Sequence, residues 1–323
     1  SASDGSALLS LLNSRAVAEI SLLLNPGTHF KIGNFEALPA MLRSDVDMAE
    51  EVSELVDISD ADLSTWELDR SFQGDQVVRV SGKISDSIAR VREEWAVRTA
   101  RVTELERRNN EAIAVREALP ARMALAPEAE DVTLRNNPDF EYRKFDRGAR
   151  LDLDVVGKVI DLVSFAVGCM FGRYSLDEPG LILADQGATV QDYLAKVPSP
   201  AFAPDKDNVI PIVDGDWFED DIVARFRTFL RVAFGEQYFE ENLRFVTESL
   251  GVKDIRDYFV RSFYKDHVQR YKKRPVYWLF SSPKGSFNAL IYMHRYTPST
   301  VSTVLNEYLR EFTAKLSSSL RQQ

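Results

Sequence analysis

Residues 159–187 read VIDLVSFAVGCMFGRYSLDEPGLILADQG, and this stretch decides the fold. In this stretch a long apolar run is followed directly by a short polar segment. The apolar run predicts a buried helix over 151–174. Its longest nearly uncharged part, 162–172, is too short to span a bilayer. Gly168 and Gly172 lie four residues apart. We expect this pair of small residues to let another backbone pack closely against the helix.

Helical spacing extends to both sides of this run. Apolar residues three and four positions apart predict helices over 7–24, over 84–119, twice within 217–250, and from Ser299 or Thr300 to Leu316. In the acidic stretch the pattern predicts one helix and a second, short helix that starts after Ser59-Asp60. Prolines and asparagines gather in 120–150, which we interpret as the main boundary of the chain.

The strands come late in the chain. β-prone runs at 276–280 and 287–293 flank Ser281-Ser282-Pro283-Lys284-Gly285 and predict a hairpin. Residues 197–215 are rich in Pro and Asp and predict a loop. The expected fold class is therefore mainly α with a small β-hairpin (α+β), with a helical arm followed by a C-terminal helical domain.

Composition excludes several classes of protein. The chain has 323 residues, 45% hydrophobic and 28% charged, as in ordinary soluble globular proteins, and no signal peptide pattern at its start. A single cysteine, Cys169, excludes an internal disulfide and fits a reducing cytoplasm, and we expect a buried thiol. The histidines, His29, His267 and His294, lack the spacing of a zinc or iron site. We expect His267 to be exposed.

The net charge of −10 is unevenly distributed. Residues 44–69 contain ten acids and no Lys or Arg. These acids are Asp45, Asp47, Glu50, Glu51, Glu54, Asp57, Asp60, Asp62, Glu67 and Asp69. Residues 253–274 instead contain eight basic residues and three acids, which makes them the local basic patch of note.

Two other motifs have plain structural interpretations. The acids in 213–221 suggest a Mg²⁺ or Ca²⁺ loop but lack its alternating ligands, so we expect Asp216, Asp220 or a neighbour to cap a helix. No paired acids are followed by the spacing of a metal-dependent nuclease. The loop at 281–285 lacks the glycine frame of a phosphate-binding loop and is expected to be a hairpin tip.

Two stretches carry a resemblance to a known family. Residues 159–187, together with RPVYWLFSSPKGSFNALIYMHRY at 274–296, closely resemble the C-terminal region of the BREX phage-defence adenine-specific DNA methyltransferases (PglX/BrxX family), relatives of the type IIG restriction–modification enzymes. Residues 8–39 look like the segment that closes the target-recognition region there. The resemblance implies four parts: the end of target recognition (1–43), acidic helices and a helical arm (44–126), a linker (127–150), and a C-terminal helical domain (151–323) with its hairpin at 275–294.

The motifs of the catalytic module are missing from this chain. No Gly-x-Gly occurs, although S-adenosylmethionine requires a glycine-rich turn. The nearest sequence to the adenine-gripping tetrapeptide, Asn137-Pro138-Asp139-Phe140, has the wrong third residue and is interpreted as a turn. We therefore interpret the chain as a C-terminal part that is inactive alone, with no catalytic, cofactor-binding or metal residues. S-adenosylmethionine is implied only for the full-length enzyme.

The candidate DNA contacts are basic and lie near aromatic residues. The expected phosphate contacts are Lys265, Arg270, Lys272, Lys273, Arg274 and Lys284. The interleaved aromatic residues are Tyr264, Tyr271, Tyr277, Trp278, Tyr292 and Tyr296. They fit backbone contact with nucleic acid and fit equally an aromatic core under a solvated basic rim.

Three functions follow from these patterns. The first is support of DNA target recognition and assembly in an N6-adenine methyltransferase of a BREX system, with double-stranded DNA and other BREX subunits as partners and no membrane. The second is a protein-interaction platform that docks partner subunits through the acidic helices at 44–69. The third is the C-terminal part of a type IIG restriction–modification enzyme. The side on which the 253–274 patch lies, relative to 28–39, separates the first two.

Overall fold

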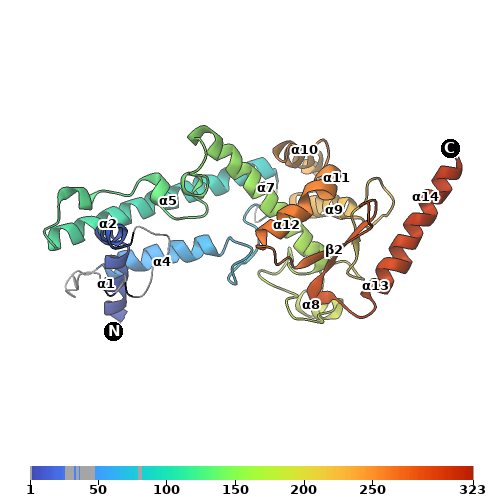
Figure 1. Ribbon diagram of the computed structural model, residues 1–323, viewed down its shortest axis with the longest axis horizontal. Helices are drawn as coiled ribbons and strands as arrows, with labels where there is room; N and C mark the ends of the chain where they lie inside the picture. The colour runs from blue at the N-terminus through green and yellow to red at the C-terminus, as the bar shows by residue number, and fades with distance from the viewer. Residues whose placement is uncertain (1, 26–32, 34–35, 37–47, 79–81, 323) are drawn as a thin grey trace. The chain divides into compact units, whose positions relative to one another are not determined.

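The computed structural model describes residues 2–25, 33, 36, 48–78 and 82–322 (Figure 1). They form two compact units. Unit 1 consists of Ser1–Leu63 and Arg92–Leu153, and unit 2 consists of Ser64–Val91 and Asp154–Gln323. The prediction about the side on which the 253–274 patch lies refers to residues 28–39. Most of that segment, namely 28–32, 34–35 and 37–39, lies outside the described residues.

Unit 1 is helical. Its helices are α1 (Ala2–Leu12), α2 (Arg15–Leu24), α4 (Ala49–Leu63), most of α5 (Ile84–Arg116), η1 (Ala121–Ala124), η2 (Ala129–Asp131), α6 (Pro138–Glu141) and the start of α7 (Arg147–Phe171). The expected long helix over 84–119 is confirmed by α5. The tetrapeptide that starts at Asn137 begins α6, because the Asn137 side chain accepts a hydrogen bond from the Asp139 amide and Pro138 takes the first helical position.

The prediction of one helix over 7–24 was wrong. Ser14 interrupts it, because the Ser14 side chain accepts a 3.3 Å hydrogen bond from the Val17 amide and caps a new helix. The helical segments on either side, Gly5–Leu12 and Arg15–Leu24, are bent by 64°. Among the described residues no single helix is long and apolar enough to cross a membrane, and this bent pair meets the length and composition test only when its two parts are taken together.

Ion pairs and hydrogen bonds fix α4 within unit 1. Arg101 on α5 donates two 2.6 Å hydrogen bonds to the Glu54 carboxylate. At the C-terminal end of α4, the buried carboxylate of Asp62 accepts hydrogen bonds from the amides of Arg135 and Asn136. The helix continues through Ser59 to Leu63, so the prediction of a separate short helix after Ser59-Asp60 was wrong.

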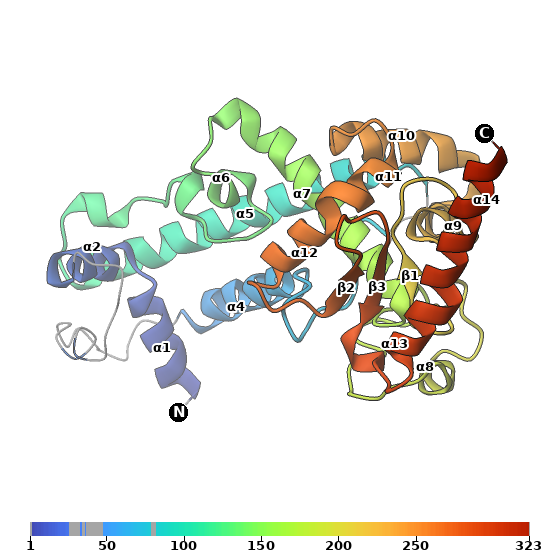
Figure 2. The same cartoon turned by 45° about the vertical axis from the view of Figure 1, so that its right-hand side comes forward.

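Unit 2 is built around α7 and a small sheet (Figure 2). Its other helices are α8 (Val190–Lys196), α9 (Ile222–Phe234), η3 (Glu236–Tyr238), α10 (Phe239–Ser249), α11 (Ile255–Tyr258), η4 (Phe259–Phe263), α12 (Tyr264–Arg270), η5 (Met293–Arg295), α13 (Thr300–Thr303), η6 (Val304–Leu309) and α14 (Arg310–Gln322). The expected helices within 217–250 are confirmed by α9 and α10, and Asp221 caps α9 by accepting from the Ala224 amide at 2.8 Å. The last helix extends beyond Leu316, and Ser299 makes no side-chain capping bond.

The sheet lies between two layers of helix. Strands β1 (Ile210–Pro211), β3 (Asn288–Tyr292) and β2 (Tyr277–Ser281) pair antiparallel in that order. Alternate residues of β3 face opposite sides. Leu290 and Tyr292 join the core around α7, whereas Ala289 and Ile291 pack with residues of η6 and α14. The expected hairpin and the mainly α class with a small β part are confirmed, but β1 falls inside the stretch 197–215, which was expected to be a loop.

Tight packing surrounds the polar exit of α7. A Cβ added at Gly168 would lie 2.2 Å from the ring of Tyr174, which the chain folds back onto its own helix. At Gly168 the expectation of a packed backbone was therefore wrong, because the close neighbour is an aromatic side chain. At Gly172 a backbone does pack closely, since the Leu183 amide donates a 3.2 Å hydrogen bond to the Gly172 carbonyl. Gly172 has a φ of +74°, which favours glycine and ends α7. Cys169, one residue beyond Gly168, is buried as expected, and burial raises its thiol pKa.

Candidate nucleic-acid interface

The C-terminal end of α12 has an unusual backbone. The Lys272 amide donates to the Gln269 carbonyl at 3.0 Å, and the Lys273 amide donates to the Val268 carbonyl at 2.8 Å. These bonds form a Schellman motif, whose left-handed position is normally glycine. Here Lys272 occupies that position with a φ of +50°, and Lys273 follows with a φ of +64°. Two adjacent lysines therefore have a backbone conformation that costs about 1 kcal/mol each.

The side chains of this turn are available for a ligand. Lys272, Lys273 and Arg274 are exposed, and within the described ranges none of them forms an ion pair. The Lys272 ammonium lies 6.0 Å from the ring centroid of Trp66, close enough for a weak cation–π contact. We call Lys272, Lys273 and Arg274 the basic turn. Its three charges meet the elementary requirement for binding phosphate.

Arg270 does not belong with the exposed cations. Its side chain is only 13% exposed, and its guanidinium lies 2.5 Å from Asp161 Oδ1 and 3.6 Å from Glu67 Oε2. Burial opposes ionisation of Arg270, but these carboxylates outweigh it and raise the pKa of the guanidinium. The structure thus contradicts the expectation of a phosphate contact at Arg270, because two carboxylates already hold its charge.

A buried polar cluster supports the basic turn from beneath. The Glu67 carboxylate accepts hydrogen bonds from Ser164 at 2.6 Å and from Tyr271 at 2.8 Å. Tyr271, which directly precedes the basic turn, is buried. The hydroxyl of Tyr174 lies 3.4 Å from the same carboxylate and accepts a 3.0 Å hydrogen bond from Arg173. Because every polar group here has a charged or hydroxyl partner, the cluster holds the start of the turn in one position.

The remaining predicted contacts are spread out. Lys265 is exposed near the start of α12, about 10 Å along the helix from Lys272 at 1.5 Å per residue. Lys284 is exposed at the hairpin tip, and the five residues of β2 separate it from the basic turn by roughly 16 Å. Figure 2 shows the end of α12 and the hairpin tip at opposite ends of β2. The basic turn is therefore the compact part of the predicted site.

His267 lies in the core, and its expected exposure was wrong. The side chain is 2% exposed, and its Nε2 accepts a 3.2 Å hydrogen bond from the Tyr277 amide. Burial, followed by the charges of Arg270 and Arg173, lowers the pKa of His267 to about 3. The ring is neutral at pH 7 and cannot attract a phosphate.

The aromatic residues divide into two groups. Tyr271, Tyr277 and Tyr292 are buried, which agrees with the interpretation of an aromatic core under a basic rim. Trp278 is 45% exposed on β2, and its ring centroid lies 6.4 Å from that of Tyr296. The aromatic residues next to the basic turn therefore serve mainly to pack the hairpin.

No local pattern indicates the role of Glu67. Glu67 is one of the ten acids of 44–69, yet it is buried against Arg270 and Tyr271, which lie more than 200 residues later. Its burial with these residues depends on contacts that are distant in sequence, which no local pattern reveals. No group of three or more potential metal ligands occurs in the described part of the chain.

Comparison with known proteins decides the relationship. No family model matches the chain. It is 30% identical over 318 residues to the adenine-specific methyltransferase BrxX of Escherichia coli O9:H4 (strain HS), an alignment that covers 94% of this chain and 26% of that protein. The chain is related to the BrxX/PglX adenine-specific methyltransferases. The PglX protein of Lacticaseibacillus casei (strain Zhang) agrees, at 32% identity over 322 residues, 93% of this chain and 24% of that protein.

The BrxX/PglX relationship confirms the resemblance expected from residues 159–187 and 274–296. The chain spans about a quarter of the length of the curated relatives it matches. The similarity runs through nearly all of the chain, so both units correspond to segments of these methyltransferases.

Proposed function

We propose that the chain is the C-terminal, non-catalytic part of an S-adenosylmethionine-dependent N6-adenine DNA methyltransferase of a BREX phage-defence system. Its part would be to hold double-stranded DNA through the basic turn while the rest of the enzyme acts on the base. The relationship to BrxX and PglX supports the parent activity. S-adenosylmethionine would be bound outside this chain, which has no glycine-rich turn to hold it.

One observation carries the proposed DNA contact. Three consecutive cations, Lys272 to Arg274, are exposed on one turn. Two of them, Lys272 and Lys273, have a left-handed backbone conformation, although the Schellman motif prefers glycine at its left-handed position. Backbone strain of this kind persists only where surrounding structure enforces it and is concentrated at functional sites. The Glu67 cluster supplies that enforcement through Tyr271.

The basic turn would contact phosphates and not base edges. A lysine is a point charge on a flexible stem, and this turn has no recognition helix that could enter a groove. Contacts of this kind fix the position of the duplex without reading its sequence. Adenine would be rotated out of the helix and methylated by the module that the chain lacks. The basic turn would keep the flanking DNA backbone in place while the adenine rotates out.

Lysine footprinting tests the contact directly. The chain is acetylated briefly with and without a DNA duplex, and the modified lysines are counted by mass spectrometry. Lys272 and Lys273 are expected to be protected by DNA, while Lys206, which is exposed elsewhere in unit 2, reacts equally in both samples. Equal protection at Lys206, or none at the basic turn, would leave the DNA role without support.

A second candidate function rests on α4. Glu50, Asp57 and Asp60 are exposed on this helix, and in the described ranges none of them forms an ion pair. Such a surface fits the docking of other BREX subunits. Replacing Asp57 by Asn separates the two functions, because it should weaken subunit assembly and leave DNA affinity unchanged.

A further inference from the structure

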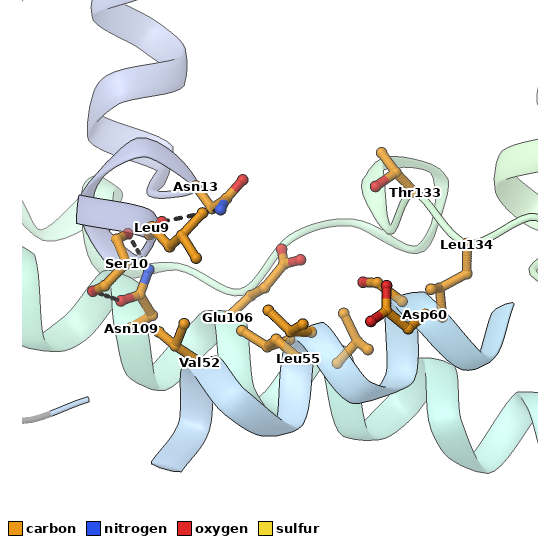
Figure 3. Close-up of a pocket in the computed structure, with 13 residues that line it drawn as sticks. Leu9, Ser10, Asn13, Val52, Leu55, Asp60, Glu106, Asn109, Thr133 and Leu134 are labelled. Atoms are coloured by element: carbon orange, nitrogen blue, oxygen red, sulfur yellow. Dashed lines mark hydrogen bonds between the residues drawn. The ribbon is translucent and has the colours of Figure 1, made fainter. Parts of the chain in front are cut away.

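Unit 1 contains a cavity of about 270 Å³ between α1, α4, α5 and residues 133–134 (Figure 3). Its apolar walls come from Val52 and Leu55 on α4, Val102 on α5, and Leu134. Thirteen described residues line the cavity, and they include two acids, Asp60 and Glu106, but no Lys or Arg. The cavity therefore combines apolar walls with negative charge.

Most polar groups at one end of the cavity are already satisfied. Asn109 donates a 2.8 Å hydrogen bond to the Ser10 carbonyl and accepts another from the Ser10 hydroxyl. The side-chain amide of Asn13 donates to the Leu9 carbonyl at 3.0 Å. Because these groups already form hydrogen bonds within the protein, they do not select the ligand.

Among the described residues that line the cavity, Glu106 is a partly buried carboxylate without a partner. Figure 3 shows its carboxylate between the end of the cavity at Ser10 and Asn13 and the end at Asp60 and Leu134. Within the described ranges it forms neither a hydrogen bond nor an ion pair. Its neighbours on α5, Arg107 and Arg108, are bound to Glu104. A partly buried carboxylate that lacks a donor is costly, and a ligand with N–H groups would remove that cost.

We propose that this cavity binds an arginine or lysine side chain presented by a partner protein next to an apolar residue. The long stem of such a side chain lies well against apolar walls while its charged end meets carboxylates. Glu106 would bind the charged end inside the cavity, and Asp60 would add negative charge at the rim. Exposed Asp57, one turn of α4 away from Asp60, adds negative charge to the approach. The cavity lies in unit 1, so this site is separate from the DNA contact proposed for unit 2.

The charge of Glu106 gives the site a dependence on pH. Burial, followed by the charge of Asp131, raises the pKa of Glu106 to about 7. Asp60 is the second acid that lines the cavity. Glu106 loses its negative charge as the pH falls through 7, so a basic ligand should bind more weakly at pH 6 than at pH 8. Binding the cation should in turn lower the pKa and release a proton.

Methyl NMR on the whole 323-residue chain tests the site with synthetic peptides. The probe is Ac-Ala-Leu-Arg-Leu-Ala-NH₂, and the matched peptide has Gln in place of Arg. We expect the Arg peptide to shift the methyl signals of Leu55 and Val102 in a saturable way, with a Kd of about 1 mM as befits a single anchoring side chain. The Gln peptide should bind about tenfold more weakly.

Variants separate the site from general acidity. Glu106→Gln should weaken binding of the Arg peptide about tenfold and remove its dependence on pH. Glu93→Gln removes the same charge from an exposed position of α5 and should leave binding unchanged. Equal binding of the Arg and Gln peptides, an unchanged affinity in Glu106→Gln, or no methyl shift up to about 5 mM peptide would each overturn the proposal. Because no DNA is present in these experiments, their results are independent of the DNA contact.

Discussion

Tyr271 donates a 2.8 Å hydrogen bond to the buried carboxylate of Glu67, 204 residues earlier in the chain. This bond connects the segment 64–91 to the C-cap residue of α12, which directly precedes the basic turn. Arg270, the preceding residue, contacts the same carboxylate. The position of the basic turn therefore depends on a residue outside its own stretch of sequence.

Loss of the Glu67 charge should destabilise unit 2. In Glu67→Gln the buried Arg270 keeps only Asp161 as an ionic partner, and we expect the free energy of unfolding to fall by about 3 kcal/mol. Urea unfolding followed by circular dichroism measures the change. Glu219→Gln, which alters an exposed acid of the same unit, should change stability by less than about 0.5 kcal/mol. Similar stability of the two variants would show that the cluster does not support the fold.

Relief of strain in the basic turn should stabilise the protein. Glycine adopts the φ of +50° found at Lys272 without a Cβ clash, so Lys272→Gly should raise the free energy of unfolding by about 0.5–1 kcal/mol. Lys265→Gly is the contrasting substitution, because it places glycine within α12 and should lower stability by about 1 kcal/mol. If both substitutions destabilise equally, Lys272 is not strained.

Packing of Tyr174 on α7 should make Gly168 intolerant of any side chain. In Gly168→Ala the new methyl group would lie 2.2 Å from the tyrosine ring, and we expect a loss of about 2–3 kcal/mol. Gly148, also on α7, has no neighbouring atom within 4 Å of an added Cβ. Gly148→Ala should therefore be neutral or slightly stabilising. Thermal unfolding of the two variants checks the contrast, and equal melting temperatures would contradict it.

Asp75 should make unit 2 less stable at high pH. Burial, followed by the charge of Asp161, raises the pKa of Asp75 to about 7. In the unfolded chain the pKa of an aspartate is about 4. Between pH 4 and pH 7 the folded state therefore binds more protons than the unfolded state. The stability that the protonated Asp75 contributes is lost as the pH rises through 7. The Asp75 carboxylate accepts a 2.8 Å hydrogen bond from the Val77 amide, and Asp75→Asn keeps an oxygen that can accept it.

The measurement is the difference in unfolding free energy between Asp75→Asn and the unaltered chain. This difference should grow in favour of the variant by about 2–3 kcal/mol between pH 5 and pH 8. A difference that stays constant over this range would mean that Asp75 ionises normally in the folded state.

Local signals in the sequence were enough for several elements. Apolar spacing identified α5 and α9, and the β-prone runs around Pro283 identified the hairpin. A local cap at Ser14 also begins α2, but the apolar pattern continues across it and conceals the break between α1 and α2. These features depend on neighbours a few residues away, which is why the sequence contains them.

The candidate site was harder to predict because it depends on distant contacts. Charge identified Lys272, Lys273 and Arg274 as exposed cations, but the same rule misplaced Arg270, whose partners are Asp161 and Glu67. His267 was misjudged for the same reason: its burial follows from packing against the hairpin. No pattern along the chain could have shown which charges pair.

The salt dependence of DNA binding tests the central proposal most directly. We compare the chain with the triple variant Lys272→Ala, Lys273→Ala and Arg274→Ala, by anisotropy of a labelled duplex over a series of KCl concentrations. Alanine retains a Cβ, so the left-handed backbone is no more strained than before. The control variant removes three exposed cations elsewhere in unit 2, namely Lys206, Arg227 and Arg310.

The basic-turn variant should bind unrelated duplexes equally weakly, and the slope of log K against log salt should fall by roughly 0.9 for each lost phosphate contact, while the control variant changes little. Unchanged affinity and slope in a correctly folded basic-turn variant, or an equal loss in the control variant, would contradict DNA contact at the basic turn.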